Sequence, residues 1–250
     1  LSSAATAVFA GEDPEKLRRI VLSTTISTNA IVQDKIDRVG MVLACGPGIS
    51  PENFHQGRDV RLISGYVNHR GIEVVSVDHT EIGRIASAFR QDDIRHAAVV
   101  GKFSTRNPKQ EQDIKAALGN GFRHISLGHR LSGHLNFPRR VATAYLNAAV
   151  WETYNGFVHQ VLNFIRTQGI TAPVYILKAD GGTFNVAESA EFPVQTILSG
   201  PAASIMGVLS MVHRREDAVV LDIGGTTTDI ALLAGGVPLL EPLGVTIGGH

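Results

Sequence analysis

The sequence predicts an α/β fold with mostly parallel sheets, and two observations support this expectation. Short apolar runs alternate along the chain with segments of helical periodicity, which is typical of strands joined by crossover helices. Several of these runs are apolar throughout and rich in β-branched residues, as expected of strands that are buried on both faces. Ala97–Val100 and Ala218–Leu221 are clear examples.

The first half of the chain alternates between strands and helices. A short helix is predicted at Asp13-Pro14-Glu15, because acidic residues and proline suit a first helical turn. Strands are expected at residues 20–22, 39–44, 97–100 and 122–127, a β-hairpin at 66–68 and 72–77, and helices at 30–35, 80–89 and 107–118. Residues 45–59 are interpreted as an excursion from the sheet, in which Cys45 is a packed thiol rather than a nucleophile.

The second half opens with the longest predicted helix, residues 138–168. Its apolar stripe has the period of a helix, and Gly169 suits its C-terminal end. Strands follow at residues 173–177 and 195–198, and then a helix of small residues at 202–209, which allows close packing. A hairpin of residues 218–221 and 230–233 closes the series.

Composition excludes several classes of protein. The chain has 23 basic and 23 acidic residues, so neither a nucleic-acid partner nor an anionic membrane is expected. Its single cysteine excludes a disulfide framework and a cysteine-based zinc site, and it favours a reducing, cytoplasmic location. The longest uncharged stretch, residues 192–213, is interrupted by prolines and polar residues and does not fit a membrane-spanning helix. A metal site at His124, His129 and His134 is disfavoured, because no carboxylate or cysteine accompanies them in the sequence.

The hairpin turn indicates phosphate binding. Gly224 and Gly225 let backbone N–H groups approach an anion, and the hydroxyl groups of Thr226, Thr227 and Thr228 add donors. Asp222, at the end of the first strand, could hold a hydrated Mg²⁺ or orient a water molecule. The alternative is an ordinary β-hairpin with a flexible turn.

Two further segments carry candidate site residues. The polar run Ser23–Asn29 leads into a helix, where hydroxyl and N–H groups could meet an anion; the alternative is simple helix capping. Asp180 precedes two glycines at the end of a strand, which is where open α/β sheets bind ligands. The alternative there is an ordinary turn.

Six ordered motifs resemble the hydantoinase A / 5-oxoprolinase family, within the superfamily of actin, Hsp70 chaperones and sugar kinases. They are Thr24–Ala30, Phe103–Glu111, Ala144–Asn147, Asp180–Gly182, Leu198–Ala203 and Asp222–Asp229. The resemblance implies a ribonuclease-H-like, actin-like ATPase fold. It also implies that residues 1–206 form an N-terminal domain and that residues 207–250 begin a second ATPase domain. We further expect that the chain is a fragment, which lacks the first phosphate loop and the adenosine motif of the superfamily.

The resemblance implies ATP-dependent, Mg²⁺-assisted opening of a cyclic amide such as a hydantoin or 5-oxoproline. Asp222 would orient the metal or water, and Gly224, Gly225, Thr226 and Thr227 would bind phosphates. Thr25 and Asn29 would face phosphate or substrate, and Asp180 the substrate amide or the metal. For Asp229 a structural role is equally compatible. The resemblance also allows a second hydantoinase-type subunit as a partner, or a homo-oligomer.

Two other functions remain open at this point. A non-hydrolytic ATP-switch protein would share the Leu198–Ala203 motif and the hairpin, although the Thr24–Ala30 and Asp180–Gly182 motifs speak against it. A ketone carboxylase subunit would use the same ATP chemistry, and no residue distinguishes it from an amidohydrolase.

Overall fold

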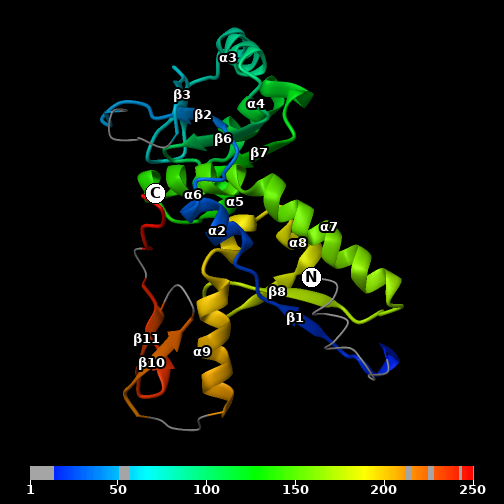
Figure 1. The fold of residues 1–250 in the computed structure, drawn as a ribbon. Coiled ribbons are helices and arrows are strands. Elements are labelled where there is room, and N and C mark those ends of the chain that lie inside the picture. The colour runs from blue at the N-terminus through cyan, green and yellow to red at the C-terminus, as the bar shows by residue number, and fades with distance from the viewer. Residues whose placement is uncertain (1–13, 51–56, 212–215, 225–227, 242–243, 250) are drawn as a thin grey trace. The chain divides into compact units, whose positions relative to one another are not determined.

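The computed structural model describes residues 14–50, 57–211, 216–224, 228–241 and 244–249. The chain divides into two compact units (Figure 1). Unit 1 comprises residues 1–34 and 153–249, and unit 2 comprises residues 35–152. The expected domain boundary between residues 206 and 207 falls inside a helix, and this division does not test it, so it stays a prediction.

Unit 2 is built on a parallel sheet of four strands in the order β3-β2-β6-β7. These strands are β2 (Val39–Ala44), β3 (Asp59–Leu62), β6 (His96–Gly101) and β7 (His124–Leu127), and every neighbouring pair is parallel. Every residue of β2 and β6 is buried, as the uninterrupted apolar runs predict for central parallel strands. The predicted parallel α/β sheet is therefore confirmed in this unit.

Helices cover both faces of this sheet. On one face, α3 (His79–Gln91) and α4 (Lys109–Leu118) bury Ile82, Phe89 and Ile114 against the strands (Figure 1). On the other face lies α6 (Phe137–Ala149), preceded by the short α5 (Gly128–Leu131). A small hairpin, β4 (Tyr66–Val67) with β5 (Glu73–Val75), and the 3-10 turn η3 (Gly119–Gly121) complete the unit. Asp78 caps α3 by accepting hydrogen bonds from the N–H groups of Thr80 and Glu81.

Unit 1 contains a sheet in the order β1-β8-β9. Its strands are β1 (Ile20–Leu22), β8 (Val174–Leu177) and β9 (Thr183–Asn185); β1 and β8 are parallel, and β8 and β9 are antiparallel. The core of this unit packs α7 (Trp151–Thr167) against β1 and β8 through Tyr154, Val158 and Ile176. Burial raises the pKa of Tyr154 to about 12, and its hydroxyl donates to Ser189 Oγ at 2.7 Å.

Unit 1 also contains α9 (Ser199–Met211) and several shorter elements. They are η1 (Pro14–Lys16), α2 (Ile26–Val32), α8 (Val186–Ser189), η4 (Pro193–Thr196) and the hairpin of β10 (Ala218–Ile223), β11 (Thr228–Ala234) and β12 (Val237–Pro238). The hairpin lies beside α9 in Figure 1. The expectation that Ala218–Leu221 is buried on both faces is wrong in this structure, since Leu221 is 57% exposed. An apolar run alone does not show that a neighbouring layer covers it.

Three other expectations are corrected. The predicted helix 138–168 is interrupted at Val150, where the Ala149 carbonyl accepts from Asp37 N–H at 2.8 Å, a tertiary contact that periodicity cannot reveal. The predicted strand 195–198 is replaced by the end of the 3-10 turn η4 and the turn that follows it, because the N–H groups of Gln195 and Ile197 donate locally to the carbonyls of Phe192 and Val194. The predicted helix 30–35 is shifted to α2, and β3 begins at Asp59, the last residue of the segment interpreted as an excursion.

No helix in the described parts of the chain is long and apolar enough to cross a membrane. Within these parts there is also no group of three or more histidine, cysteine, aspartate or glutamate residues that could hold a metal ion. The three histidines of residues 124–134 make separate contacts. His124 stacks on Trp151 at 5.0 Å, His129 Nδ1 bonds to Glu111 Oε2, and His134 N–H donates to Ser132 Oγ.

The contacts of His124 predict a pH dependence of unit 2. Burial, and then the nearby His96, Lys115 and Arg130, lower the pKa of His124 to about 3, from the 6.5 expected of an unfolded histidine. Between these pH values the unfolded chain binds a proton that the folded chain excludes, so stability falls as the pH falls.

Acidification below pH 6.5 is therefore expected to destabilise unit 2, with a slope from His124 that approaches about 1.4 kcal/mol per pH unit. His124→Phe keeps the stack on Trp151 without a titrating ring, so this variant should lose that part of the slope. Amide exchange of β7 in the full-length protein, corrected for the intrinsic effect of pH, measures it. Parallel pH profiles for the two proteins would contradict the prediction.

Candidate functional site

Helix α9 contacts three segments that the sequence singled out. Its first residues contact Thr24 and Thr25, its middle contacts Asp222, and Met206 lies against the turn at Gly181. All of these residues belong to unit 1. The helix is built from small residues in its first turns, and this composition permits the close contacts described below.

The start of α9 is joined to the Thr24–Asn29 segment by hydrogen bonds across more than 160 residues. Ser199 Oγ donates to Thr24 O at 3.0 Å and accepts from Thr24 N–H at 3.4 Å. Leu198 N–H donates to Thr28 Oγ1 at 3.1 Å. A Cβ atom on Gly200 would come within 3.1 Å of Thr25 Cγ2, so glycine permits this approach. Ser199 and Gly200 of the Leu198–Ala203 motif therefore have a structural role, because they allow α9 to lie close to Thr24 and Thr25.

Thr25 and Asn29 lie next to each other at the exposed end of this contact. Asn29 Nδ2 donates to Thr25 Oγ1 at 3.2 Å, one turn apart on α2. Thr25 is the N-cap residue but makes no side-chain capping bond, so simple capping does not account for its hydroxyl group. Ser27, by contrast, is fully buried and pairs with Thr196 Oγ1 at 3.4 Å, a structural contact.

Asp180 forms the tight turn between β8 and β9. Its Oδ1 accepts from Gly182 N–H at 2.9 Å and its Oδ2 accepts from Lys178 Nζ at 3.1 Å. Burial raises the pKa of Asp180, but the hydrogen bonds from Gly182 and Lys178 lower it more, and the net pKa lies below the usual value. Gly181 has a φ of +80°, which favours glycine in this turn. Asp180 is therefore ionised, and both of its carboxylate oxygens already accept a hydrogen bond from a residue of its own turn.

Asp222 lies near the end of β10 and is held by α9. Ser204 Oγ donates to Asp222 Oδ2 at 2.5 Å. Asp229 is the residue opposite Asp222 in the β10–β11 register and is half-buried. Gly224 follows β10 and is exposed, whereas Gly225, Thr226 and Thr227 lie outside the described residues.

The geometry of α9 decides which of these groups share a face. Gly200 and Ser204 are one helical turn apart, so the segments that they contact, at Thr25 and Asp222, lie along the same side of α9. Met206 is about 200° around the helix from Ser204, so the Asp180 turn contacts a different side. The described contacts thus bring Thr25 and Asp222 together around one helix face and do not add Asp180 to them.

The chemistry of Asp222 suits a hydrated divalent cation. Mg²⁺ in phosphoryl-transfer sites takes one or two carboxylates and completes its shell with water and phosphate oxygens. Asp222 and the opposite Asp229 supply one or two carboxylates, although the described residues form no larger metal-binding cluster. Asp222 and Asp229 therefore fit an Mg²⁺ ion that takes most of its ligands from water and phosphate.

Sequence reasoning missed several residues that organise the structure. Ser204 was singled out by no motif, although its spacing of four residues from Gly200 places it on the same helix face. Glu111 was quoted only as part of a motif, yet it is fully buried and binds His129. The sequence-based argument that no carboxylate accompanies the histidines is corrected by this contact, which joins residues 18 positions apart.

The sequence matches two regions of one protein family. Residues 3–121 match the hydantoinase/oxoprolinase N-terminal region, and residues 140–246 match hydantoinase/oxoprolinase. Caprolactamase subunit alpha of Pseudomonas jessenii is 26% identical over 239 residues, which cover 85% of this chain and 34% of the relative. 5-Oxoprolinase 1 of Arabidopsis thaliana is 26% identical over 261 residues, which cover 87% of this chain and 20% of the relative.

A solved structure has the same fold. The nucleotide-free structure of acetone carboxylase, an enzyme of ATP-dependent acetone carboxylation, has a TM-score of 0.78 and 18% sequence identity, and the match covers 94% of this chain and 38% of that one. At this identity the likeness concerns the fold. The chain spans about a third or less of the length of the two curated relatives described above.

Proposed function

The chain belongs to the hydantoinase/oxoprolinase family, and we propose that it is part of an ATP-dependent enzyme that opens a cyclic amide. The names of the relatives, a caprolactamase and a 5-oxoprolinase, support this reaction class. We also propose that the fold is of the ribonuclease-H-like, actin-like ATPase type. In that proposal residues 1–206 form the first domain and residues from 207 onward begin the second.

The reaction class explains why such an enzyme needs a phosphate-binding hairpin. A lactam carbonyl carbon is a weak electrophile, so direct attack by water is slow. Transfer of the γ-phosphoryl group breaks its bond to ADP and forms a bond to the amide oxygen, which makes that oxygen a leaving group. Water can then add to the carbon, and the tetrahedral species expels the ring nitrogen, which takes up a proton, so that the C–N bond breaks and an acyl phosphate remains. Hydrolysis of the acyl phosphate gives the ring-opened acid and releases phosphate. The protein must therefore stabilise phosphoryl charge and position the reacting groups.

Asp222 carries the proposal, because α9 holds its carboxylate in place through Ser204 on the same side as Thr25. We assign Asp222 to orientation of Mg²⁺ or water, and Ser204 to the positioning of Asp222. Gly224, Gly225, Thr226 and Thr227 are proposed to bind phosphate oxygens through backbone N–H and hydroxyl groups. ATP with Mg²⁺ would supply the phosphoryl group.

Thr25 and Asn29 are proposed to face phosphate or substrate. Their hydroxyl and amide groups lie at the exposed end of the α2–α9 contact. Asp180 is proposed to contact the substrate amide. Its turn contacts a different side of α9 from Thr25 and Asp222, so this role requires a substrate that extends beyond the side that those two residues share. The subunit designation of the caprolactamase supports a second hydantoinase-type subunit as partner; a homo-oligomer is the alternative.

The proposed function predicts ATP hydrolysis that depends on a cyclic amide. In the full-length protein, with its partner subunit where one exists, 5-oxoproline or hydantoin should raise the rate of ADP release, and the ring-opened product should form in equal amount. Dependence on bicarbonate and a ketone instead would identify a carboxylase. ATP turnover that no small molecule stimulates would indicate an ATP switch. Either of these results would overturn the proposed function.

A further inference from the structure

A histidine and a buried carboxylate are in direct contact at the carboxyl edge of the parallel sheet in unit 2. Glu111 lies in the first turn of α4 and is fully buried. His129 lies in α5, two residues after the carboxyl end of β7. In open α/β sheets, ligands bind beyond the carboxyl ends of the strands. The Phe103–Glu111 motif, to which the proposed function gives no role, therefore ends at an edge of the sheet that suits a reaction.

Backbone and side-chain donors together hold the Glu111 carboxylate. Its Oε1 accepts from Gly101 N–H at 2.8 Å, at the end of β6, and its Oε2 accepts from His129 N–H at 3.0 Å. A Cβ atom on Gly128 would come within 3.1 Å of Oε1, so glycine lets the chain pass this close to the carboxylate. The Nδ1 atom of His129 also bonds to Oε2, at 2.5 Å. The backbone bonds already tie α5 and β6 to α4, so the imidazole bond is not needed for that connection.

The contact with Glu111 determines which nitrogen of His129 is available. A carboxylate only accepts hydrogen bonds, so Nδ1 carries the proton of the neutral ring and Nε2 keeps its lone pair. Because the backbone N–H and Nδ1 bond to the same oxygen, the orientation of the ring is fixed as well. The His129 side chain is 15% exposed, and within the described part of the chain its Nε2 has no hydrogen-bond partner. His129 thus has an available acceptor nitrogen on an oriented ring.

A buried cation accompanies the buried carboxylate. Arg140 is fully buried, and its Nη2 donates to Gly101 O at 2.7 Å and to Lys102 O at 2.6 Å. Burial lowers the pKa of Arg140, whereas the charge of Glu111 raises it. The end of β6 thus binds one buried anion and one buried cation, and their hydrogen bonds offset part of the cost of burying two charges. A carboxylate held beside an imidazole stabilises the imidazolium that forms when Nε2 takes up a proton.

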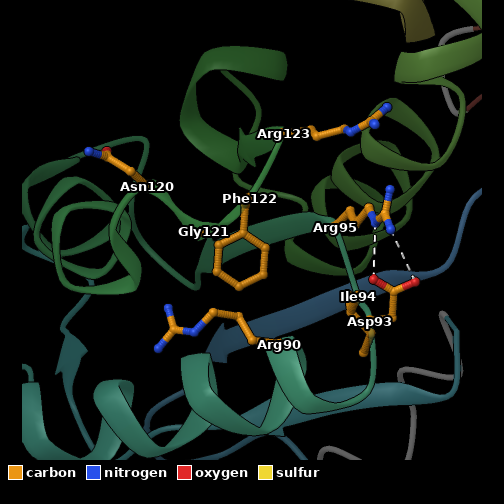
Figure 2. A pocket seen from close by; sticks show the side chains of 8 residues that line it. All are labelled: Arg90, Asp93, Ile94, Arg95, Asn120, Gly121, Phe122 and Arg123. Carbon is orange, nitrogen blue, oxygen red and sulfur yellow. Dashed lines mark hydrogen bonds and ion pairs between the residues drawn. The ribbon is translucent and has the colours of Figure 1, made fainter.

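A cavity at the amino edge of the same sheet has a different character. It is about 360 Å³ in volume, lies before β6 and β7, and its lining includes three arginines (Figure 2). Figure 2 shows Arg95 paired with Asp93, and Arg123 is paired with Glu152. A guanidinium group does not give up its proton in proteins, and Asp93 is already engaged by Arg95. This cavity therefore offers no proton-transfer group, and its remaining arginine, Arg90, serves as a control position.

From this arrangement we propose that His129 transfers the proton in the ring-opening step and that Glu111 positions it, an inference that rests on the proposed function. Nε2 takes a proton from water as the water oxygen bonds to the carbon of the phosphorylated amide. The same proton then passes from Nε2 to the ring nitrogen as the C–N bond breaks, and His129 is neutral again. Glu111 keeps its charge throughout and stabilises the imidazolium between the two transfers.

His129→Asn separates ring opening from phosphoryl transfer. Asparagine keeps the backbone N–H and an amide donor for Glu111 Oε2, but it has no group that takes up a proton. In a single turnover of the full-length protein with ATP, Mg²⁺ and whichever of 5-oxoproline and hydantoin stimulates the wild type, ADP should form at the wild-type rate. The ring-opened product should form about 10²- to 10⁴-fold more slowly, the usual contribution of general acid–base catalysis. The controls His134→Asn, at an exposed position of the same segment, and Arg90→Met should form both products at wild-type rates.

A second measurement needs neither substrate nor nucleotide. In nuclear magnetic resonance spectra of the protein with ¹⁵N-labelled histidine, the neutral ring of His129, identified by its absence from His129→Asn, should carry its proton on Nδ1. A proton on Nε2 would overturn the inference whatever the enzyme does. Wild-type ring opening in His129→Asn, or an equal loss of ADP and of ring-opened product, would overturn it and leave the proposed function intact. If neither cyclic amide stimulates the wild type, the proposed function fails and this inference fails with it.

Discussion

Asp222→Asn is expected to lower substrate-dependent ATP turnover by about 10²- to 10³-fold in the full-length protein, equivalent to about 3 kcal/mol of transition-state stabilisation. The change removes a negative charge while the shape of the side chain stays nearly the same. The loss should appear in kcat rather than in KM for the cyclic amide, because the carboxylate acts on the metal or water and not on substrate binding.

Two further variants make this prediction specific. Ser204→Ala keeps the carboxylate but removes the hydroxyl group that donates to it, so its kcat should fall between those of the wild type and Asp222→Asn. Asp217→Asn removes an equal charge from the same hairpin. Asparagine can still accept the bond from Gly235 N–H, so this control should keep its activity. Unchanged turnover in Asp222→Asn would remove Asp222 from the mechanism.

Arg140→Met is expected to destabilise unit 2 by about 3–5 kcal/mol, the usual cost of removing one member of a buried charged network. Arg140 donates to the carbonyls of Gly101, Lys102 and His134, and methionine would leave these acceptors without that donor. Glu111 would also lose the buried cation that binds the same strand end. Chemical denaturation monitored by amide exchange of β6 and β7 measures the effect.

A double-mutant cycle distinguishes the network from a simple packing defect. If Glu111 and Arg140 act together on Gly101, the double variant Glu111→Gln/Arg140→Met should lose less stability than the sum of the two single variants. Arg84→Met, at an exposed position on α3, is the matched control and should change stability by less than about 0.5 kcal/mol. Additive losses would show that the two charges are not coupled.

Local sequence patterns were sufficient to place several of the strands. The bounds of β1 and β2 agree with the predicted strands, and the parallel sheet of unit 2 follows from the alternation of such strands with amphipathic helices. The same reasoning erred at Val150, at residues 195–198 and at Ala218–Leu221. In each case a contact or its absence, rather than the local pattern, decided the structure.

The sequence by itself determined the α/β class and, through its ordered motifs, the family. Only the tertiary structure decided that α9 gathers Thr25 and Asp222 on one side, and that Glu111 and Arg140 both bind the end of β6. The physical reason is the range of the interactions involved. Side-chain periodicity encodes which face of an element is buried, whereas the partners of Ser199, Ser204 and Arg140 depend on how distant elements pack.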